Sequence, residues 1–120
     1  MAVPAAALVL VGADRQVAKS ACGIDPEQLG NLAESFDKYV VVNGSLVRVD
    51  DARGHPLFKK YSVVGAGRVV SYLGVPLADS AGNTVGALSV FDHVPRQWRP
   101  GHIQILDDLA GVATARMFGA

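Results

Sequence analysis

Residues 69–91 read VVSYLGVPLADSAGNTVGALSVF, and this stretch decides the fold of the chain. Two runs rich in β-branched and aromatic residues, 69–77 and 84–91, flank a turn at Ala81-Gly82-Asn83. Such runs on either side of a short turn containing glycine are typical of an antiparallel hairpin. We therefore expect a β-sheet that is built around this hairpin.

A second hairpin is predicted near the N-terminus. The apolar run 6–11 ends at Gly12, and residues 16–22 read as a second, half-exposed strand after a polar turn. The first run has no basic flank and about half the length of a membrane span, so it indicates a buried strand. A further short strand is expected over residues 46–49, before two aspartates.

Two helices complete the predicted elements. Asp25 can cap a helix that opens at Pro26 and extends to Val40, and the closing helix should run from Pro100 to about Phe118. Residues 55–61 predict one or two helical turns. This order lacks the strict strand–helix alternation of a parallel sheet. It favours an α+β fold with an antiparallel sheet, in a single domain over residues 1–120.

Composition narrows the classes of function. Half of the 120 residues are hydrophobic, which suits one compact domain. Eleven basic residues balance eleven acidic ones without clustering, which argues against nucleic acid or a membrane as a partner. The lone Cys22 cannot form an intramolecular disulfide or a cysteine-based zinc site. A reducing, cytoplasmic location is expected.

Four segments carry a likeness to a known family through their order and spacing. They are Leu46–Phe58 with its Asp-Ala-Arg turn, Ser71–Leu77, Gly82–Asp92, and Pro95–Pro100 followed by a helix containing Leu106-Asp-Asp-Leu-Ala110. From about Phe36 to Ala110 the chain thereby resembles the GAF family of bacterial sensor domains.

The resemblance implies a GAF/PAS-like architecture. Its central antiparallel sheet has five or six strands, with helices packed on one face and a cavity between the sheet and the loops on the other. Family members bind cyclic nucleotides, haem, bilins, amino acids or no known ligand, so the cofactor of this chain stays unknown. Members commonly begin with a helix before the first strand. Here Ala5 already belongs to the strand, so that helix is absent or lies outside this sequence.

One branch of the family is enzymatic and reduces free methionine sulfoxide with several cysteines that attack and then resolve as a disulfide. This chain has Asp37 and Ser89 where related sequences often carry cysteine, and Cys22 alone cannot complete the cycle. We expect Cys22 to be a small packed hydrophobe and the chain not to be an enzyme.

Aromatic residues give the candidate ligand site. Phe36, Tyr39, Phe58, Tyr61, Tyr72 and Phe91 come from elements that surround the cavity of the family. Buried tyrosine hydroxyls need polar partners, so Tyr61 and Tyr72 are expected to face a polar ligand or water. Ser89 points either into the pocket or at a backbone carbonyl. The predicted ligand-binding residues are Tyr39, Phe58, Tyr61, Tyr72 and Ser89.

Other polar residues have simpler interpretations. The three histidines are scattered without a metal-ligand spacing, so no metal site is predicted. A haem needs only one axial histidine, and His55 is the best candidate for that alternative. Asp50, Asp51 and Arg53 are read as turn-forming residues that cap backbone amides. Trp98 is expected to anchor the closing helix.

The expected core follows from the apolar positions of these elements. It comprises Leu8, Leu10, Leu32, Phe36, Val75, Leu88, Val90, Leu106 and Leu109.

Two functions remain open. The first is a regulatory sensory domain in which a small molecule orders the loop over residues 53–68 and shifts the closing helix. The alternative is a structural dimerisation module with a collapsed pocket. A connected cavity of roughly 300 Å³ or more would favour the first.

The closing helix is expected to carry a homodimer. Its apolar arc covers about 160° of the helical wheel, which is wider than one core contact requires, and two-fold pairing is the commonest route to a homodimer. Ile105, Leu109 and Val112 form one edge of this arc. In the competing interpretation, Ile105 and Val112 bury against a first helix or against the N-terminal end of the same chain.

Overall fold

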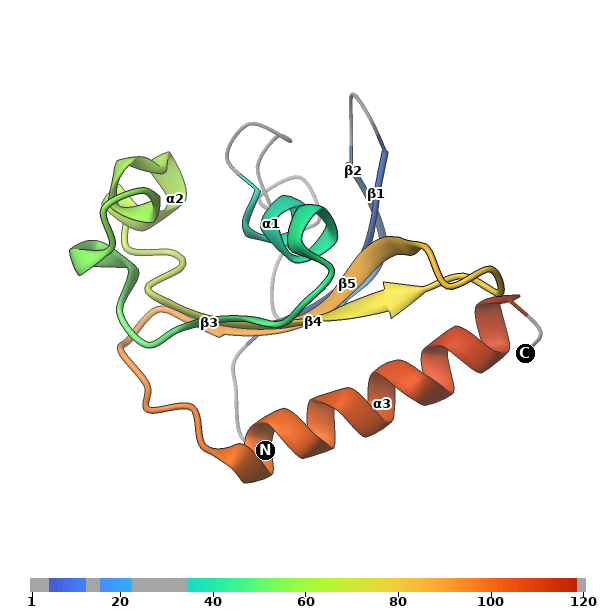
Figure 1. Cartoon of the computed structure of the whole chain (residues 1–120). Coiled ribbons are helices and arrows are strands. Elements are labelled where there is room, and N and C mark those ends of the chain that lie inside the picture. Colours follow the sequence, from blue (N-terminus) through green and yellow to red (C-terminus); the bar gives the residue numbers. More distant parts are fainter. Residues whose placement is uncertain (1–4, 13–15, 23–34, 119–120) are drawn as a thin grey trace.

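The computed structural model describes residues 5–12, 16–22 and 35–118. Figure 1 shows an antiparallel sheet with helices on both faces. The elements are β1 (Ala5–Val11), β2 (Gln16–Cys22), α1 (Phe36–Asn43), β3 (Val47–Val49), η3 (Ala52–Gly54), η4 (Phe58–Lys60), α2 (Ser62–Gly65), β4 (Ser71–Ala78), β5 (Thr84–Asp92) and α3 (Pro100–Phe118). The α+β class and the antiparallel pairing predicted from the sequence are confirmed.

The strands lie in the order β2-β1-β5-β4-β3, and every neighbouring pair is antiparallel. The predicted hairpin at the centre of the sequence is β4–β5. Its turn is closed by Asp79, whose side chain accepts hydrogen bonds from the amides of Ala81 and Asn83 at 3.0 and 2.9 Å. Gly82 has a φ of 87°, a backbone conformation that glycine adopts without strain. The sequence therefore places the central hairpin correctly.

Helix α1 is shorter than the helix predicted over residues 25–40. It begins at Phe36 because the side chain of Ser35 accepts a hydrogen bond from the amide of Lys38, and it ends where Gly44 adopts the left-handed conformation. The predicted helix start at Asp25 and Pro26, and the predicted core residue Leu32, lie outside the described residues. Phe36 and Val40 are buried, so the apolar face of the described part is confirmed.

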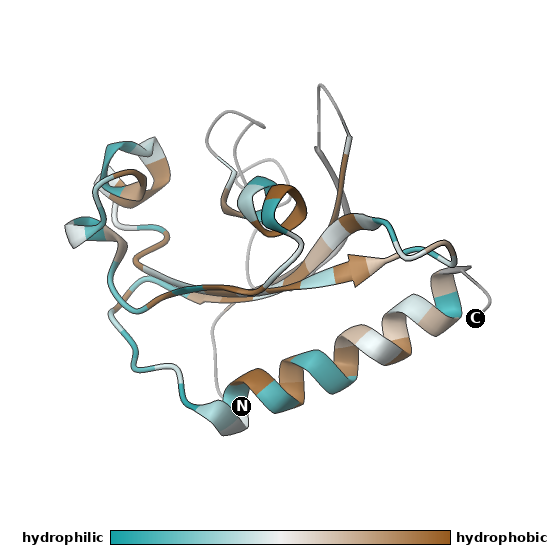
Figure 2. Ribbon diagram, viewed as in Figure 1, coloured by the Kyte–Doolittle hydropathy of each residue, from teal (hydrophilic) through white to brown (hydrophobic). Residues whose placement is uncertain are grey.

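The sheet separates two hydrophobic clusters. Helices α1 and α2 lie over one face and α3 lies under the other (Figure 1). Because both faces are covered, β4 and β5 carry apolar side chains toward both faces; Figure 2 shows brown segments along both strands with paler ones between them. The resemblance implied helices on one face and loops on the other, whereas here α1 shares the second face with the loops.

Half of the predicted core residues that the structure describes are buried. Phe36, Val75, Val90 and Leu106 are buried, while Leu8, Leu10 and Leu88 are only half-buried. The residues that alternate with them, such as Val9 and Ala87, face α1 and are the fully buried ones. The prediction for Leu109 is wrong, because this side chain is 53% exposed on the outer side of α3.

The segment between β5 and α3 is fixed to β3, the strand at one edge of the sheet. The indole nitrogen of Trp98 donates to the carbonyl of Val49 at 3.1 Å, and the Trp98 side chain is buried beside Leu106. Arg96 donates to the buried carboxylate of Asp92 at 2.6 Å. Trp98 therefore anchors the closing helix, as the sequence predicts.

Substituting Gly86 with alanine should destabilise the fold. A Cβ atom at this position would lie 2.2 Å from the carbonyl oxygen of Val9, which is backbone and cannot move without disturbing the pairing of β1 with β5. We expect a loss of about 1–3 kcal/mol in the free energy of unfolding, measured by urea denaturation.

Gly111→Ala is the matched control for this substitution. It adds the same methyl group in open space within α3 and should stabilise the protein by about 0.5–1 kcal/mol. A Gly86→Ala protein as stable as the parent would show that β1 and β5 do not approach as described.

Candidate functional site

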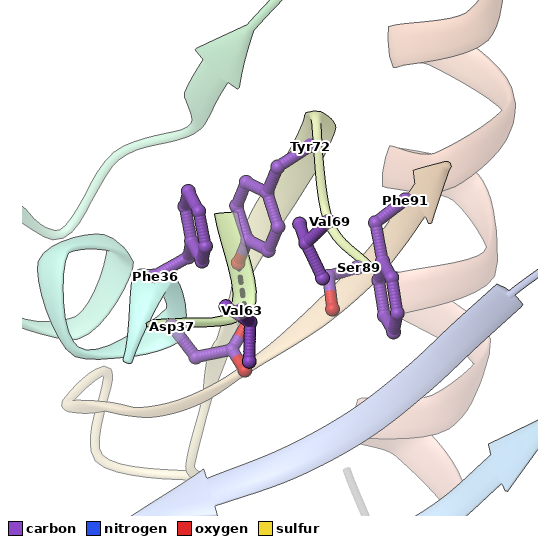
Figure 3. Close-up of a pocket in the computed structure, with 7 residues that line it drawn as sticks. All are labelled: Phe36, Asp37, Val63, Val69, Tyr72, Ser89 and Phe91. Atoms are coloured by element: carbon purple, nitrogen blue, oxygen red, sulfur yellow. Dashed lines mark hydrogen bonds between the residues drawn. The ribbon is translucent and has the colours of Figure 1, made fainter. Parts of the chain in front are cut away.

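A pocket lies between α1, α2 and the sheet on the face opposite α3 (Figure 3). Its cavity has a volume of about 20 Å³, which is room for one or two water-sized groups. The walls combine apolar side chains with a small polar centre. The lining residues are Phe36, Asp37, Val63, Val69, Tyr72, Ser89 and Phe91.

Asp37 is the polar centre of the pocket. It is the second residue of α1, and its side chain points down toward the sheet, where the hydroxyl of Tyr72 donates a hydrogen bond to its carboxylate (Figure 3). The residue is only 6% exposed. No cationic side chain pairs with it among the residues that the structure describes. A carboxylate so placed is costly to ionise, since burial removes its hydration.

The protonation of this carboxyl is correspondingly shifted. Burial raises the pKa of Asp37 from 3.8 to about 6, although hydrogen bonds from Tyr72 and Ser89 partly oppose the rise. Burial and the neighbouring carboxylate raise the pKa of Tyr72 well above its usual value, so the phenol stays protonated and remains a donor. Asp37 is therefore the group of this pocket that changes charge in the neutral pH range.

The sheet positions the two hydroxyl groups below Asp37. Tyr72 on β4 and Ser89 on β5 point to the same face, and the ring of Tyr72 lies along the strand over Gly74. A Cβ atom on Gly74 would meet the Tyr72 hydroxyl at 2.2 Å, so only glycine leaves room for this orientation. The hydroxyl of Ser89 lies 3.5 Å from the carbonyl oxygen of Ala7, which is a long contact, and it also hydrogen-bonds with Asp37 and Tyr72.

An aromatic cluster forms one side of the pocket. The ring of Phe36 stacks on Tyr72 at a centroid distance of 4.8 Å and contacts Phe58 at 4.5 Å. Tyr61 meets Phe36 edge-on at 5.3 Å, which is a favoured geometry for aromatic pairs. This cluster holds α1 and the turns η4 and α2 together above the sheet.

The five predicted ligand-binding residues divide into two groups. Tyr72 and Ser89 line the pocket. Phe58 and Tyr61 are buried in the aromatic cluster, and Tyr39 is half-buried against Phe58 at 5.4 Å. The Tyr61 hydroxyl lies 3.5 Å from the carbonyl of Ser35. These three residues build the wall behind the pocket and do not line it.

Asp37 was not among the predicted site residues. It follows Phe36 in a predicted helix, where a charged residue next to an apolar face usually reaches solvent. The available signal was its position, because Asp37 and Ser89 both stand where related sequences often carry cysteine. Two positions that both carry cysteine in related sequences suggest a shared site for their side chains, here those of Asp37 and Ser89.

Other polar candidates have structural roles. The Nδ1 atom of His55 accepts hydrogen bonds from the amides of Leu57 and Phe58 at 3.1 and 3.3 Å, and the imidazole stacks on Phe58. His55 does not line the pocket, which has no room for a haem. Asp51 caps the amide of Arg53 at 3.1 Å, as the sequence predicts.

Neither a metal cluster nor a membrane span is found in the described parts of the chain. Among these residues, no three histidine, cysteine, aspartate or glutamate side chains gather in a group that could hold a metal ion. Nor does any helix there combine the length and the apolar composition needed to cross a bilayer.

The antiparallel sheet has a pocket on one face and a long closing helix on the other, which defines a small α+β domain. The family model of the GAF domain matches residues 2–117. The chain therefore belongs to the GAF domain family.

One relative is similar in sequence. A cyclic di-GMP phosphodiesterase of Pseudomonas aeruginosa is 32% identical over 94 residues, which cover 78% of this chain and 16% of that protein. The chain thus spans about a sixth of that relative's length.

Solved structures share the fold at low identity. The GAF domain of a phosphoenolpyruvate-protein phosphotransferase from Acinetobacter has a TM-score of 0.72 and 20% identity, covering 94% of this chain and 69% of that one. A free methionine-R-sulfoxide reductase from Neisseria meningitidis, solved in complex with its substrate, has a TM-score of 0.75 and 21% identity. The match covers 95% of this chain and 66% of that one. Both likenesses concern the fold alone.

Asp37→Asn should remove a pH dependence of stability. The pKa of Asp37 is about 6 in the folded protein and 3.8 for an aspartate in the unfolded chain, so the folded state holds the proton more tightly. Its stabilising contribution is complete below about pH 4 and is lost as the pH rises through 6. Relative to Asp37→Asn, the parent should lose about 2–3 kcal/mol of unfolding free energy between pH 4 and 7.5.

Urea denaturation at several pH values measures this difference. Asp107→Asn, an exposed position on α3, controls for the loss of one carboxylate. Parallel pH profiles for the parent and Asp37→Asn would contradict the buried position of this carboxyl.

Proposed function

We propose that this GAF domain is a regulatory sensory module, without catalytic activity of its own, that binds a small ligand in the pocket around Asp37. The observation that carries the proposal is the buried polar centre of Asp37, Tyr72 and Ser89 at the base of a pocket lined otherwise by apolar side chains. A few convergent polar groups in an apolar pocket are the usual composition of a small-molecule site. The cytoplasm is the proposed location.

The size of the pocket limits the ligand. A volume of about 20 Å³ is far below the roughly 300 Å³ that would favour ligand binding, so on volume alone the module with a collapsed pocket is favoured over a site for a drug-sized molecule. A ligand in this conformation is therefore a small group, and a larger molecule requires the wall to move. We propose that this movement would involve α2, a helix of four residues that contributes Val63 to the wall. Helix α2 lies within residues 53–68, the loop that a ligand is expected to order.

Sequence similarity and the cysteine content of the chain both favour a regulatory role over a catalytic one. The phosphodiesterase relative is a much longer protein, of which this chain matches 16%. A single cysteine in the whole sequence cannot carry out an attack-and-resolve thiol cycle. A binding role would account for the cost of burying Asp37, a carboxyl that has hydrogen bonds from Tyr72 and Ser89 but no cationic partner among the described residues.

Ligand binding can be tested by thermal unfolding against a panel of amino acids, cyclic nucleotides and small amines. A ligand of the folded state should raise Tm by about 5 °C or more at saturating concentration. The rise should disappear in Ser89→Val, which fills the pocket and removes a hydroxyl. Ser80→Val, in the exposed β4–β5 turn, is the control and should respond like the parent.

Native mass spectrometry of the protein purified from cells complements the panel, since it reports any retained small molecule directly. If no compound shifts Tm and no mass is retained, the ligand-binding function is wrong and the module with a collapsed pocket takes its place.

A second function, homodimerisation through α3, is favoured by a separate observation. Ile105, Leu109 and Val112 are 46%, 53% and 54% exposed, although all three are large apolar residues. Their spacing of four and then three residues is that of a coiled-coil seam. The opposite side of the helix contacts the sheet through Leu106 and Ala110, so this seam is available to a second copy of the chain.

Replacing Ile105 and Val112 together with glutamate should dissociate such a dimer. Two like charges on each copy at the seam repel across the interface, and light scattering should report a folded monomer. The control is Gln104→Glu with Gly111→Glu, which places the same charges seven residues apart on a neighbouring exposed side of the helix. A parent protein that is already monomeric would contradict the dimer.

A further inference from the structure

We infer that the pocket around Asp37 binds an ammonium group, either the free ammonium ion or the head of a small primary amine. The inference names the ligand class of the proposed function and rests on it. Three observations support it: the charge of the site, its size and the arrangement of its acceptors and rings.

The charge of the site calls for a cation. Asp37 brings a carboxylate into the protein interior, and the other lining residues are uncharged at neutral pH. Among the described residues, the titratable groups that line the pocket are Asp37 from α1 and Tyr72 from β4. Helix α2 contributes Val63, and β5 contributes Ser89 and Phe91. A buried charge without an opposite charge is destabilising, so a bound cation would recover the lost stability.

The size of the site excludes a large head group. A cavity of about 20 Å³ holds one or two groups of the size of water, which is also the size of an ammonium group. A trimethylammonium head does not fit this space. Any longer amine would have to leave its carbon stem at the mouth of the pocket and insert only its nitrogen.

The acceptors match the three or four hydrogens of an ammonium group. Tyr72 donates its hydrogen to Asp37, and Ser89 hydrogen-bonds with both Asp37 and Tyr72. A hydroxyl oxygen has two lone pairs, so each of these oxygens offers a further acceptor. Together with the carboxylate of Asp37, these oxygens provide acceptors on α1, β4 and β5. Each acceptor lies on a different element, so the nitrogen would link the helix to both central strands.

The aromatic walls favour ammonium over a metal ion. The rings of Phe36, Tyr72 and Phe91 line the same pocket. Ring faces attract organic cations through the cation–π interaction. Calcium instead takes six to eight oxygen ligands and magnesium demands six in octahedral order, whereas this pocket offers one carboxylate and two hydroxyls.

Thermal unfolding at constant ionic strength tests the inference. Ammonium chloride and methylammonium chloride should raise Tm of the parent protein, and equal concentrations of sodium, potassium or tetramethylammonium chloride should not. Ammonium stays protonated between pH 5 and 7.5, whereas Asp37 ionises across that range with a pKa of about 6. The apparent Kd of ammonium should therefore be about 10-fold larger at pH 5 than at pH 7.5, which means weaker binding at pH 5.

Variants locate the effect. Asp37→Asn keeps the volume and removes the charge, so the ammonium response should vanish; Asp107→Asn should respond like the parent. Gly74→Ala retains Asp37 but pushes the Tyr72 hydroxyl away, and it should weaken ammonium binding. If Asp37→Asn does not fold, the pH dependence and the selectivity over potassium in the parent protein decide the matter.

The outcomes separate this inference from the proposed function. A response to potassium equal to that to ammonium, or a response that persists in Asp37→Asn, overturns the ammonium site. If a nucleotide or another uncharged or anionic compound raises Tm through Ser89 while amines do not, the sensory function stands and this inference falls. If nothing in the panel raises Tm, both fall.

Discussion

The structure depends on strand β5, which pairs with β1 on one side and β4 on the other. Backbone contact with β1 is close enough that Gly86 has no space for a Cβ atom. Side chains of β5 alternate between the two layers: Ser89 and Phe91 face the pocket, while Leu88 and Val90 face α3. One strand thus forms the floor of the pocket and the support of the closing helix, so the two layers cannot be disturbed independently.

The sequence predicted the fold well because its signals were local. Turn residues such as Gly82, the opening Pro100 and the apolar runs each specify an element without reference to the rest of the chain. The error at Leu109 has a different origin. A helical wheel shows that an apolar arc is wide, but it does not show which edge of the arc meets the sheet; the crossing of α3 over β4 selects Leu106 and Ala110.

The site was harder to predict because it depends on contacts between distant residues. Ser89 was found from its polarity within an apolar strand, which is a local anomaly. Tyr72 was found through the resemblance, as a tyrosine on an element that surrounds the cavity of the family. Asp37 gains its meaning only from the packing of α1 on the sheet, which brings it to Tyr72, 35 residues away. Phe58 and Tyr61 were assigned to the ligand because aromatic residues serve both cores and binding sites, and only their edge-to-face contact in the structure distinguishes the two uses.

The tether at the start of α3 has a mechanical consequence. Trp98 donates a hydrogen bond to the carbonyl of Val49 in β3, and Arg96 donates to Asp92, so the segment that leads into the helix is fixed to the sheet. Beyond Ala110 the helix has few buried residues. The helix is therefore held at its N-terminal end, and a rotation about that end moves its C-terminal end the most. At 1.5 Å per residue its 19 residues reach about 28 Å. When the helix tilts about its N-terminal end, the displacement of Phe118 is therefore several times larger than that of Leu106.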